Sequence, residues 1–122
     1  MNGAMLNESK KMNKDELIIK NVIKYINELD LITKDKDKTF FYNDTNEFNK
    51  IINRVIKIGE CLSKISDETK NKYPHINWDI IKEKALDEEK VGYEMNVKDA
   101  YDLGSKLLKE ELYDKLIELI KR

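Results

Sequence analysis

The sequence is poor in the residues that mark disulfide-stabilised proteins and most enzymes. Its 122 residues include one Cys, one Pro, one His and four Gly. A lone Cys61 excludes an intramolecular disulfide and a cysteine-based metal site. No apolar run approaches the roughly 18 residues of a membrane-spanning helix, and no signal-peptide pattern opens the chain. We therefore expect a cytoplasmic location.

The composition is that of a folded helical protein with balanced charge. Charged residues make up 39% and hydrophobic residues 40% of the chain. This aliphatic content is too high for a disordered chain, and the length fits one domain. A net charge of −1 gives the chain as a whole no electrostatic case for nucleic-acid binding. No cofactor or metal site is predicted, because the Lys-Asp run over residues 34–38 lacks the Gly and distal Glu of a calcium loop.

Residues 1–11 are polar and have no periodicity, so they predict a loose leader before a helical domain over residues 12–122. The first helix is expected from near Asp15 to about Ile32 because its apolar residues recur at helical spacing. They are Ile18, Ile19, Val22, Ile23, Tyr25, Ile26 and Leu29. Residues 33–39 predict a solvated loop.

A second helix is predicted from Asp44 to near Ser66, since Asp44 and Glu47 have the spacing of a capping box. Its apolar stripe consists of Phe48, Ile51, Ile52, Val55, Ile58, Leu62 and Ile65. Gly59 lies inside this helix. A glycine there costs about 1 kcal/mol relative to Ala, and it predicts the close approach of another helix.

The second half of the chain predicts three further helices. A short helix over residues 67–73 must end before Pro74. A third main helix is expected to start at Trp78, capped by Asn77, and a last one follows Asn96 with a bend at Gly104. Because no run alternates with period two, the predicted fold is all-α, an antiparallel four-helix bundle with a short extra helix.

Three segments then occur in a recognisable order. They are Ile58-Gly59-Glu60 on the long second helix, Lys72-Tyr73-Pro74-His75-Ile76-Asn77-Trp78, and Gly92-Tyr93 before the last helix. This order resembles HepT-like proteins of the HEPN superfamily, the ribonuclease-toxin half of HEPN/nucleotidyltransferase toxin–antitoxin pairs. Cys61 stands where the family has Ala, and Asn77 where it has Pro. The resemblance covers roughly residues 14–121.

The resemblance implies a metal-independent endoribonuclease whose catalytic residues are missing here. The family's Arg-x4-His motif supplies a base for the ribose 2′-hydroxyl and a cation for the phosphate. With Gly92-Tyr93 as the anchor, Leu86 takes the Arg position, Val91 the His position and Asp87 the polar position after the Arg. Neither Arg nor His occurs between Trp78 and Tyr93. We therefore predict no catalytic residue and expect a pseudoenzyme, although the sequence leaves the question of activity open.

The resemblance also implies partners. HepT-like relatives form homodimers across a two-fold axis and bind a nucleotidyltransferase antitoxin. Tyr93 matches the tyrosine that such a partner adenylylates, so it is a candidate regulatory residue as well as a candidate packing residue. RNA is expected as a partner only if the protein is active.

Two other interpretations stay open, and the remaining singled-out residues have plain explanations. The chain could be an active HepT-like endoribonuclease toxin with a displaced site, or a helical interaction module that shares only the architecture. His75 is interpreted as a surface turn residue and Trp78 as a core or dimer-edge anchor. Cys61 is interpreted as a small buried hydrophobe. Glu60 is interpreted as a structural capping or inter-helix partner, with simple exposure as the alternative.

Overall fold

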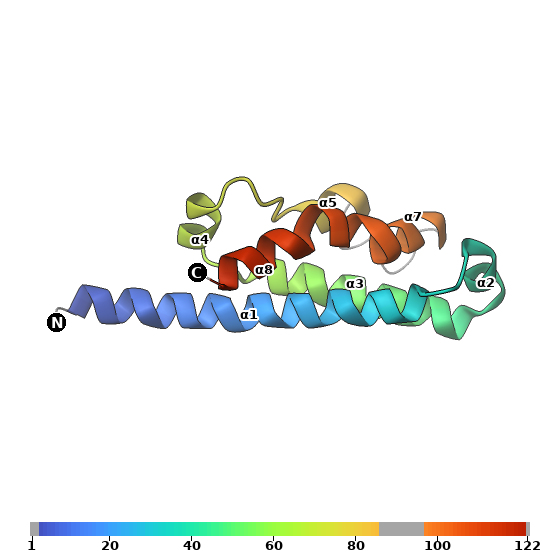
Figure 1. Cartoon of the computed structure of the whole chain (residues 1–122), viewed down its shortest axis with the longest axis horizontal. Helices are drawn as coiled ribbons and strands as arrows, with labels where there is room; N and C mark the ends of the chain where they lie inside the picture. The colour runs from blue at the N-terminus through green and yellow to red at the C-terminus, as the bar shows by residue number, and fades with distance from the viewer. Residues whose placement is uncertain (1–2, 86–96, 122) are drawn as a thin grey trace.

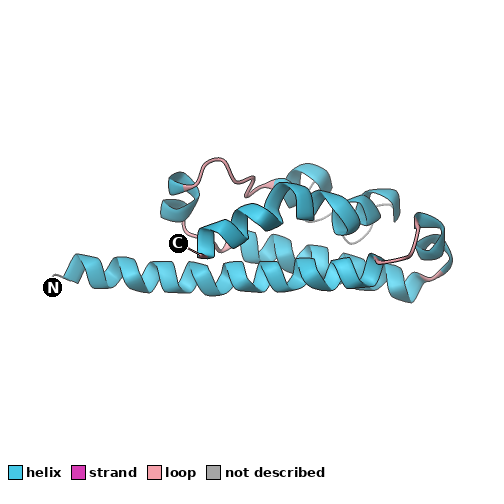
Figure 2. Cartoon of the chain, in the orientation of Figure 1, coloured by secondary structure: helices cyan, strands magenta, loops and turns pink. Residues whose placement is uncertain are grey.

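The chain folds into helices joined by short loops (Figures 1 and 2). A computed structural model describes residues 3–85 and 97–121, with side chains over residues 14–83 and 97–121. No strand occurs in the part of the chain that the structure describes, which confirms the all-α prediction.

Three long helical segments build the body of the protein. They are α1 (Gly3–Thr33), α3 (Thr45–Ser63) and a last segment that joins α7 (Val97–Asp102), η1 (Leu103–Leu107), η2 (Lys109–Tyr113) and α8 (Asp114–Ile120). α1 runs opposite to both α3 and the last segment and contacts both (Figure 1).

Short helices complete the fold, namely α2 (Lys38–Asn43), α4 (Asp67–Lys72) and α5 (Ile80–Ala85). The described residues thus form three long segments and do not confirm a bundle of four main helices. The predicted third main helix begins at Ile80 rather than Trp78, and its expected continuation to residue 90 lies outside the described residues. The Asn77 side chain donates from Nδ2 to Glu83 Oε2 at 2.9 Å, and the Asn77 backbone carbonyl accepts the Ile80 N–H at 3.3 Å.

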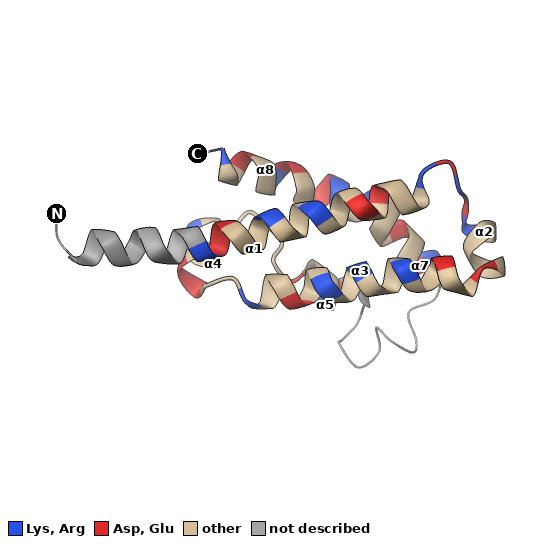
Figure 3. Cartoon of the chain, turned by 90° about the horizontal axis from the view of Figure 1, so that it is seen from below, with Lys and Arg blue, Asp and Glu red and all other residues tan. Residues whose placement is uncertain are grey.

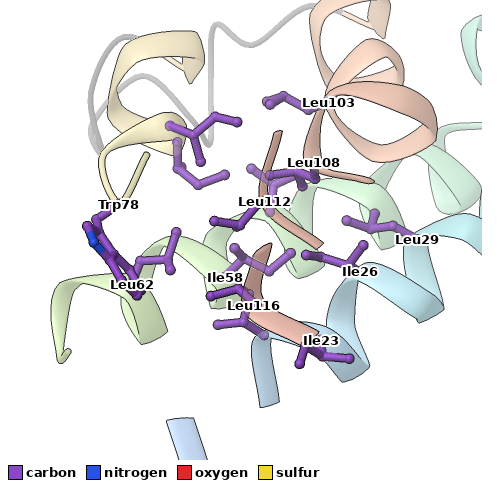
Figure 4. Packing of buried hydrophobic residues seen from close by; sticks show 14 of the residues in the cluster. Ile23, Ile26, Leu29, Ile58, Leu62, Trp78, Leu103, Leu108, Leu112 and Leu116 are labelled. Carbon is purple, nitrogen blue, oxygen red and sulfur yellow. The ribbon is translucent and has the colours of Figure 1, made fainter. Parts of the chain in front are cut away.

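The core lies where the three long segments face one another. Ile26 and Leu29 of α1 meet Ile58 of α3 and the leucines of the last segment (Figure 4). The predicted stripe residues are buried in the centre of α1 and α3, whereas Ile18, Tyr25 and Phe48 are half-buried at the margins. Burial of such aliphatic side chains stabilises the fold by roughly 1.5–3 kcal/mol each.

α1 begins at Gly3, well before the expected helix start near Asp15. Residues 3–14 contain Ala, Leu, Met, Glu and Lys, which are strong helix formers, and no Pro. An established helix extends into such a sequence because each added residue gains a hydrogen bond without a new nucleation step. The boundary between leader and domain near residue 12 remains a prediction.

The connection between α1 and α3 contains the helix α2, where only a loop was expected. Asp37 caps α2 by accepting the Phe40 backbone N–H at 3.1 Å. Phe41 then inserts into the core and lies 5.7 Å from the Tyr101 ring, centre to centre. The Tyr101 hydroxyl donates to the Lys36 carbonyl at 2.6 Å, which ties this connection to the last segment.

The start of α3 agrees with the predicted cap. The Asp44 carboxylate accepts the Glu47 backbone N–H at 3.1 Å. The Glu47 carboxylate pairs with Lys50 at 2.6 Å, and this hydrogen bond is the main cause that lowers the pKa of Glu47. α3 ends at Ser63, three residues before the expected Ser66.

The last segment carries two π-helical turns near the predicted bend at Gly104. Leu103 and Leu108 are both fully buried although they are five residues apart. In a regular α-helix this spacing directs two side chains to different faces, because one turn holds only 3.6 residues. The wider π turn of η1 brings both onto the core face. Gly104 lies against α1, where a Cβ atom would meet Leu29 Cδ2 at 3.2 Å.

Gly59 faces α5, as its position inside a long helix predicts. A Cβ atom there would lie 3.2 Å from Ile81 Cγ2. We expect Gly59→Leu to overpack the α3–α5 contact and to lower the free energy of unfolding by roughly 1–3 kcal/mol in urea titrations followed by circular dichroism. Asn53→Leu, on the exposed side of the same helix, is the matched control with an effect within about 0.5 kcal/mol. Equal stability of the two variants would contradict the close packing.

Candidate functional site

The segment from Lys72 to Trp78 forms a compact turn closed by the indole. The Tyr73 carbonyl accepts the Ile76 backbone N–H at 3.2 Å and Trp78 Nε1–H at 3.1 Å. Tyr73, Ile76 and Trp78 are all buried, while Pro74 and His75 are exposed at the tip. Trp78 is therefore a core anchor, one of its two predicted roles, and whether it also borders a dimer remains a prediction.

This turn is continuous with the Gly59 contact. α5 starts two residues after Trp78 and places Ile81 against Gly59. The first two segments of the HepT-like order, 58–60 and 72–78, are thus joined through α5. Glu60 is exposed, which agrees with the simpler of its two interpretations.

The third segment, Gly92-Tyr93, lies outside the described residues. Leu86, Asp87, Val91 and Tyr93 lie outside the described residues, which stop at Ala85 and resume at Val97. The predictions made for these four residues therefore stay predictions.

His75 is a surface turn residue, as expected. Its ring lies 6.3 Å from the Tyr73 ring, and its backbone carbonyl accepts a hydrogen bond from Lys115 Nζ at 3.3 Å. An open depression beside it is lined by Lys70, Pro74, His75, Ile76, Asn77, Trp78 and Asp79. Among these residues no acidic group forms a hydrogen bond or ion pair with the imidazole, so the geometry gives His75 no partner to tune it as a base.

The structure contains a buried carboxylate that was not predicted from the sequence. Asp15 on α1 is 3% exposed and accepts hydrogen bonds from the Ser66 backbone N–H at 3.2 Å, Ser66 Oγ at 2.6 Å and Thr69 Oγ1. Ser66 in turn caps α4 by accepting the Thr69 backbone N–H at 3.3 Å. Asp15 therefore ties α1 to the start of α4, beside a groove of about 300 Å³ that also reaches Lys121.

The hydrogen bonds of Asp15 have the arrangement of a structural site rather than of a catalytic or metal-binding one. All its donors are neutral, and within the described residues no group of three His, Cys, Asp or Glu is arranged to hold a metal ion. A carboxylate satisfied by an amide and two hydroxyls is a positioning device for α4 and for the turn that follows it. The only sequence signal was an acidic residue just before the first apolar stripe, which is common at exposed helix starts.

A second unpredicted polar cluster lies between α1 and α3. Arg54 Nη2 is 3.9 Å from Glu28 Oε1, the long limit of an ion pair. Arg54 Nε and Glu28 Oε2 are both buried and have no hydrogen-bond partner among the described residues. One turn along, the Tyr25 ring lies beneath lysine ammonium groups from both helices.

Cys61 is half-buried rather than buried. Burial raises the pKa of its thiol, and Glu60 adds to that effect while Lys64 opposes it. A thiol with a raised pKa is protonated at neutral pH, so Cys61 is not an activated nucleophile.

No protein-family model, curated protein or solved structure matches this chain. No helix in the described part of the chain combines the length and apolar character needed to cross a membrane.

Proposed function

We propose that this chain is a HEPN-like helical module related to HepT-like ribonuclease toxins, that it does not cleave RNA, and that it acts by binding a protein partner. The observation that supports this most is the grouping of Gly59, the Tyr73-Pro74 turn and Trp78 around α5. Gly59 is separated from the turn by fourteen positions, and the order of these residues is that of the HepT-like pattern.

The chemistry of the remaining residues favours a silent protein. A metal-independent ribonuclease needs a base for the 2′-hydroxyl and a cation for the phosphate. The chain has one His and two Arg, His75, Arg54 and Arg122. His75 lies on an exposed turn, and Arg54 is directed toward Glu28 on another helix. In the proposed alignment Leu86 and Val91 supply neither chemical group.

The proposed module is a homodimer, since HepT-like relatives place the helix that carries the Arg-x4-His motif across a two-fold axis and symmetric pairs are the commonest oligomers. Aliphatic residues at positions 86 and 91 make such a central surface more apolar and favour association. The proposed partner is a nucleotidyltransferase, with Tyr93 as the residue it modifies. Co-expression with a nucleotidyltransferase encoded beside this gene tests this, and the expected result is a co-eluting complex with an adenylyl group on Tyr93 by mass spectrometry.

The purified chain is expected to leave total tRNA uncut. General acid–base catalysis is typically worth about 10²–10⁴-fold and an electrostatic clamp a similar factor, so the loss of both leaves no rate above background. The measurement is gel analysis of tRNA after prolonged incubation, with an active HepT-like ribonuclease as the positive control.

Specific cuts that persist through repurification, and that disappear in His75→Ala or Lys84→Ala, would contradict the proposal. They would indicate an active ribonuclease with a displaced site.

A further inference from the structure

Two lysines from different helices converge on one aromatic ring. Lys24 Nζ of α1 lies 6.0 Å from the centre of the Tyr25 ring, and Lys57 Nζ of α3 lies 5.6 Å from it. Both lysines are exposed, and within the described residues neither forms an ion pair. Both ammonium groups bring positive charge to the same ring, which makes this part of the surface a candidate site for an anion.

Arg54 extends this cluster by one turn. It lies between Lys50 and Lys57 on α3, and its ionic partner among the described residues is Glu28, at 3.9 Å. The Arg54 side chain keeps 28% of its surface exposed. A guanidinium held this loosely retains donors for a phosphate, which it recognises better than a lysine does because its donors form a planar fork. We call Lys24, Tyr25, Arg54 and Lys57 the cationic seam; its three cations have the carboxylates of Glu28 and Glu60 as acidic neighbours.

The surface around the cationic seam is elongated. Blue bands recur along both α1 and α3, which run side by side, with red bands among them (Figure 3). Lys50 on α3 and the exposed Lys64 at its C-terminal cap mark two ends of this face, fourteen residues or roughly 21 Å apart along a helix. Two neighbours weaken the field, because Lys50 is paired with Glu47 at 2.6 Å and Glu60 is exposed one turn from Lys57.

We propose that the cationic seam binds single-stranded nucleic acid, with Lys24, Arg54 and Lys57 contacting phosphates and the Tyr25 ring contacting a base. Proteins that bind single strands without sequence preference combine cationic side chains, which contact the phosphates, with aromatic side chains, on which the bases stack. The net charge of −1 does not oppose this, since binding depends on the local field. This proposal does not rest on the HEPN-like function and requires no residue outside the described part of the chain.

An acidic polypeptide is the competing occupant. It would use the same cations, and Leu17 and Leu31, exposed on α1 at 63% and 70%, would offer it apolar contacts. It has no use for the face of the Tyr25 ring. The ring is therefore the feature that favours a nucleic acid, and the test separates the two occupants.

The experiment measures fluorescence anisotropy of a labelled oligouridylate of about 12 nucleotides, within the site sizes known for single-strand binders. We expect saturable binding at low salt that weakens as salt rises, with a log–log slope of about −2 for three phosphate contacts at about −0.7 each. Lys24→Gln combined with Lys57→Gln is expected to weaken binding about tenfold or more and to reduce the slope by about 1.4.

The matched control is Lys98→Gln combined with Lys106→Gln. These two lysines are exposed on the last helical segment, so the change in net charge is the same. The control is expected to bind like the parent. Tyr25→Leu, which retains an apolar side chain at a half-buried position, is expected to weaken binding about fivefold or more through lost stacking. Thermal unfolding by circular dichroism verifies that all variants are folded.

Three results would overturn the proposal. One is no binding of the parent at low salt, and another is equal weakening by the two double variants. The third is full competition by polyglutamate together with an unchanged affinity of Tyr25→Leu, which would assign the cationic seam to an acidic polypeptide.

Discussion

Asp15→Ala is expected to lower the free energy of unfolding by about 2–4 kcal/mol, the largest loss of stability that we expect from replacing a single polar residue in this chain. The carboxylate accepts hydrogen bonds from a backbone N–H and two hydroxyls in a site that is 3% exposed. Alanine leaves the Ser66 N–H without an acceptor at the start of α4. The two hydroxyls can turn toward other acceptors, and the buried charge disappears, so the loss stays below the sum of three charged hydrogen bonds.

Two control variants separate the loss of the buried hydrogen bonds from the loss of a carboxylate charge. Asp15→Asn keeps one carboxamide oxygen as acceptor and is expected to lose about 1–2 kcal/mol. Glu16→Ala removes the neighbouring carboxylate, which makes only an ion pair at 3.5 Å with Lys20. It is expected to change stability by less than about 1 kcal/mol. Urea titrations provide the measurement. An Asp15→Ala protein as stable as Glu16→Ala would show that the network around α4 contributes nothing.

Loss of Asp15 is also expected to destabilise α4 and the turn after it more than the rest of the fold. α4 is a six-residue helix, too short to persist without tertiary contacts. It leads directly into the turn that Trp78 closes over the Tyr73 carbonyl. In Asp15→Ala, amide hydrogen exchange is therefore expected to accelerate over residues 64–79 more than in the centre of α3.

The two long helices were predictable because their signals are local. A broad apolar stripe at helical spacing fixes the buried faces of α1 and α3, and Asp44 followed by Glu47 marks the start of α3 within one residue. Gly59 was informative for the same reason, since a glycine inside a strong helix needs a neighbour that excludes a side chain.

The features that the sequence did not predict depend on residues far apart. Asp15 is separated from Ser66 by 51 positions and from Thr69 by 54, so no spacing rule connects them. α2 is too short for a periodic pattern and depends on the insertion of Phe41 beside Tyr101. The π turns place Leu103 and Leu108 on one face of the last segment. The need for this arrangement comes from packing against α1 and α3, which no local sequence pattern records.

The candidate site was predictable only in part. The order of its segments can be read from the sequence. The packing of Gly59 against α5, and the turn that Trp78 closes just before α5, agree with that order. The cationic seam was not predictable, because Lys24, Arg54 and Lys57 are ordinary surface cations until α1 and α3 bring them around Tyr25.

Leu86→Arg combined with Val91→His is expected to create weak, metal-independent RNA cleavage. In the proposed alignment these changes restore the phosphate-stabilising cation and the base at the two motif positions, five residues apart in the sequence. Glu88→Asn and Glu89→Lys are added, because the acidic residues beside Leu86 repel RNA. We expect a cleavage rate about 100-fold above the background of the parent, the low end of what general acid–base catalysis contributes. The gain is expected to be small because a catalytic site whose groups are misplaced by about 1 Å loses much of its rate.

The control for this gain of activity exchanges the two new residues. Leu86→His with Val91→Arg, again combined with Glu88→Asn and Glu89→Lys, has the same composition and net charge but the wrong chemical order, and it is expected to remain silent. Tyr93→Phe is expected to leave cleavage intact, since the tyrosine serves regulation or packing. Light scattering of the parent tests the proposed homodimer. Equal cleavage by both orders would show that added charge alone recruits RNA and a contaminating nuclease, and a structure with residues 86 and 91 directed apart would exclude the alignment itself.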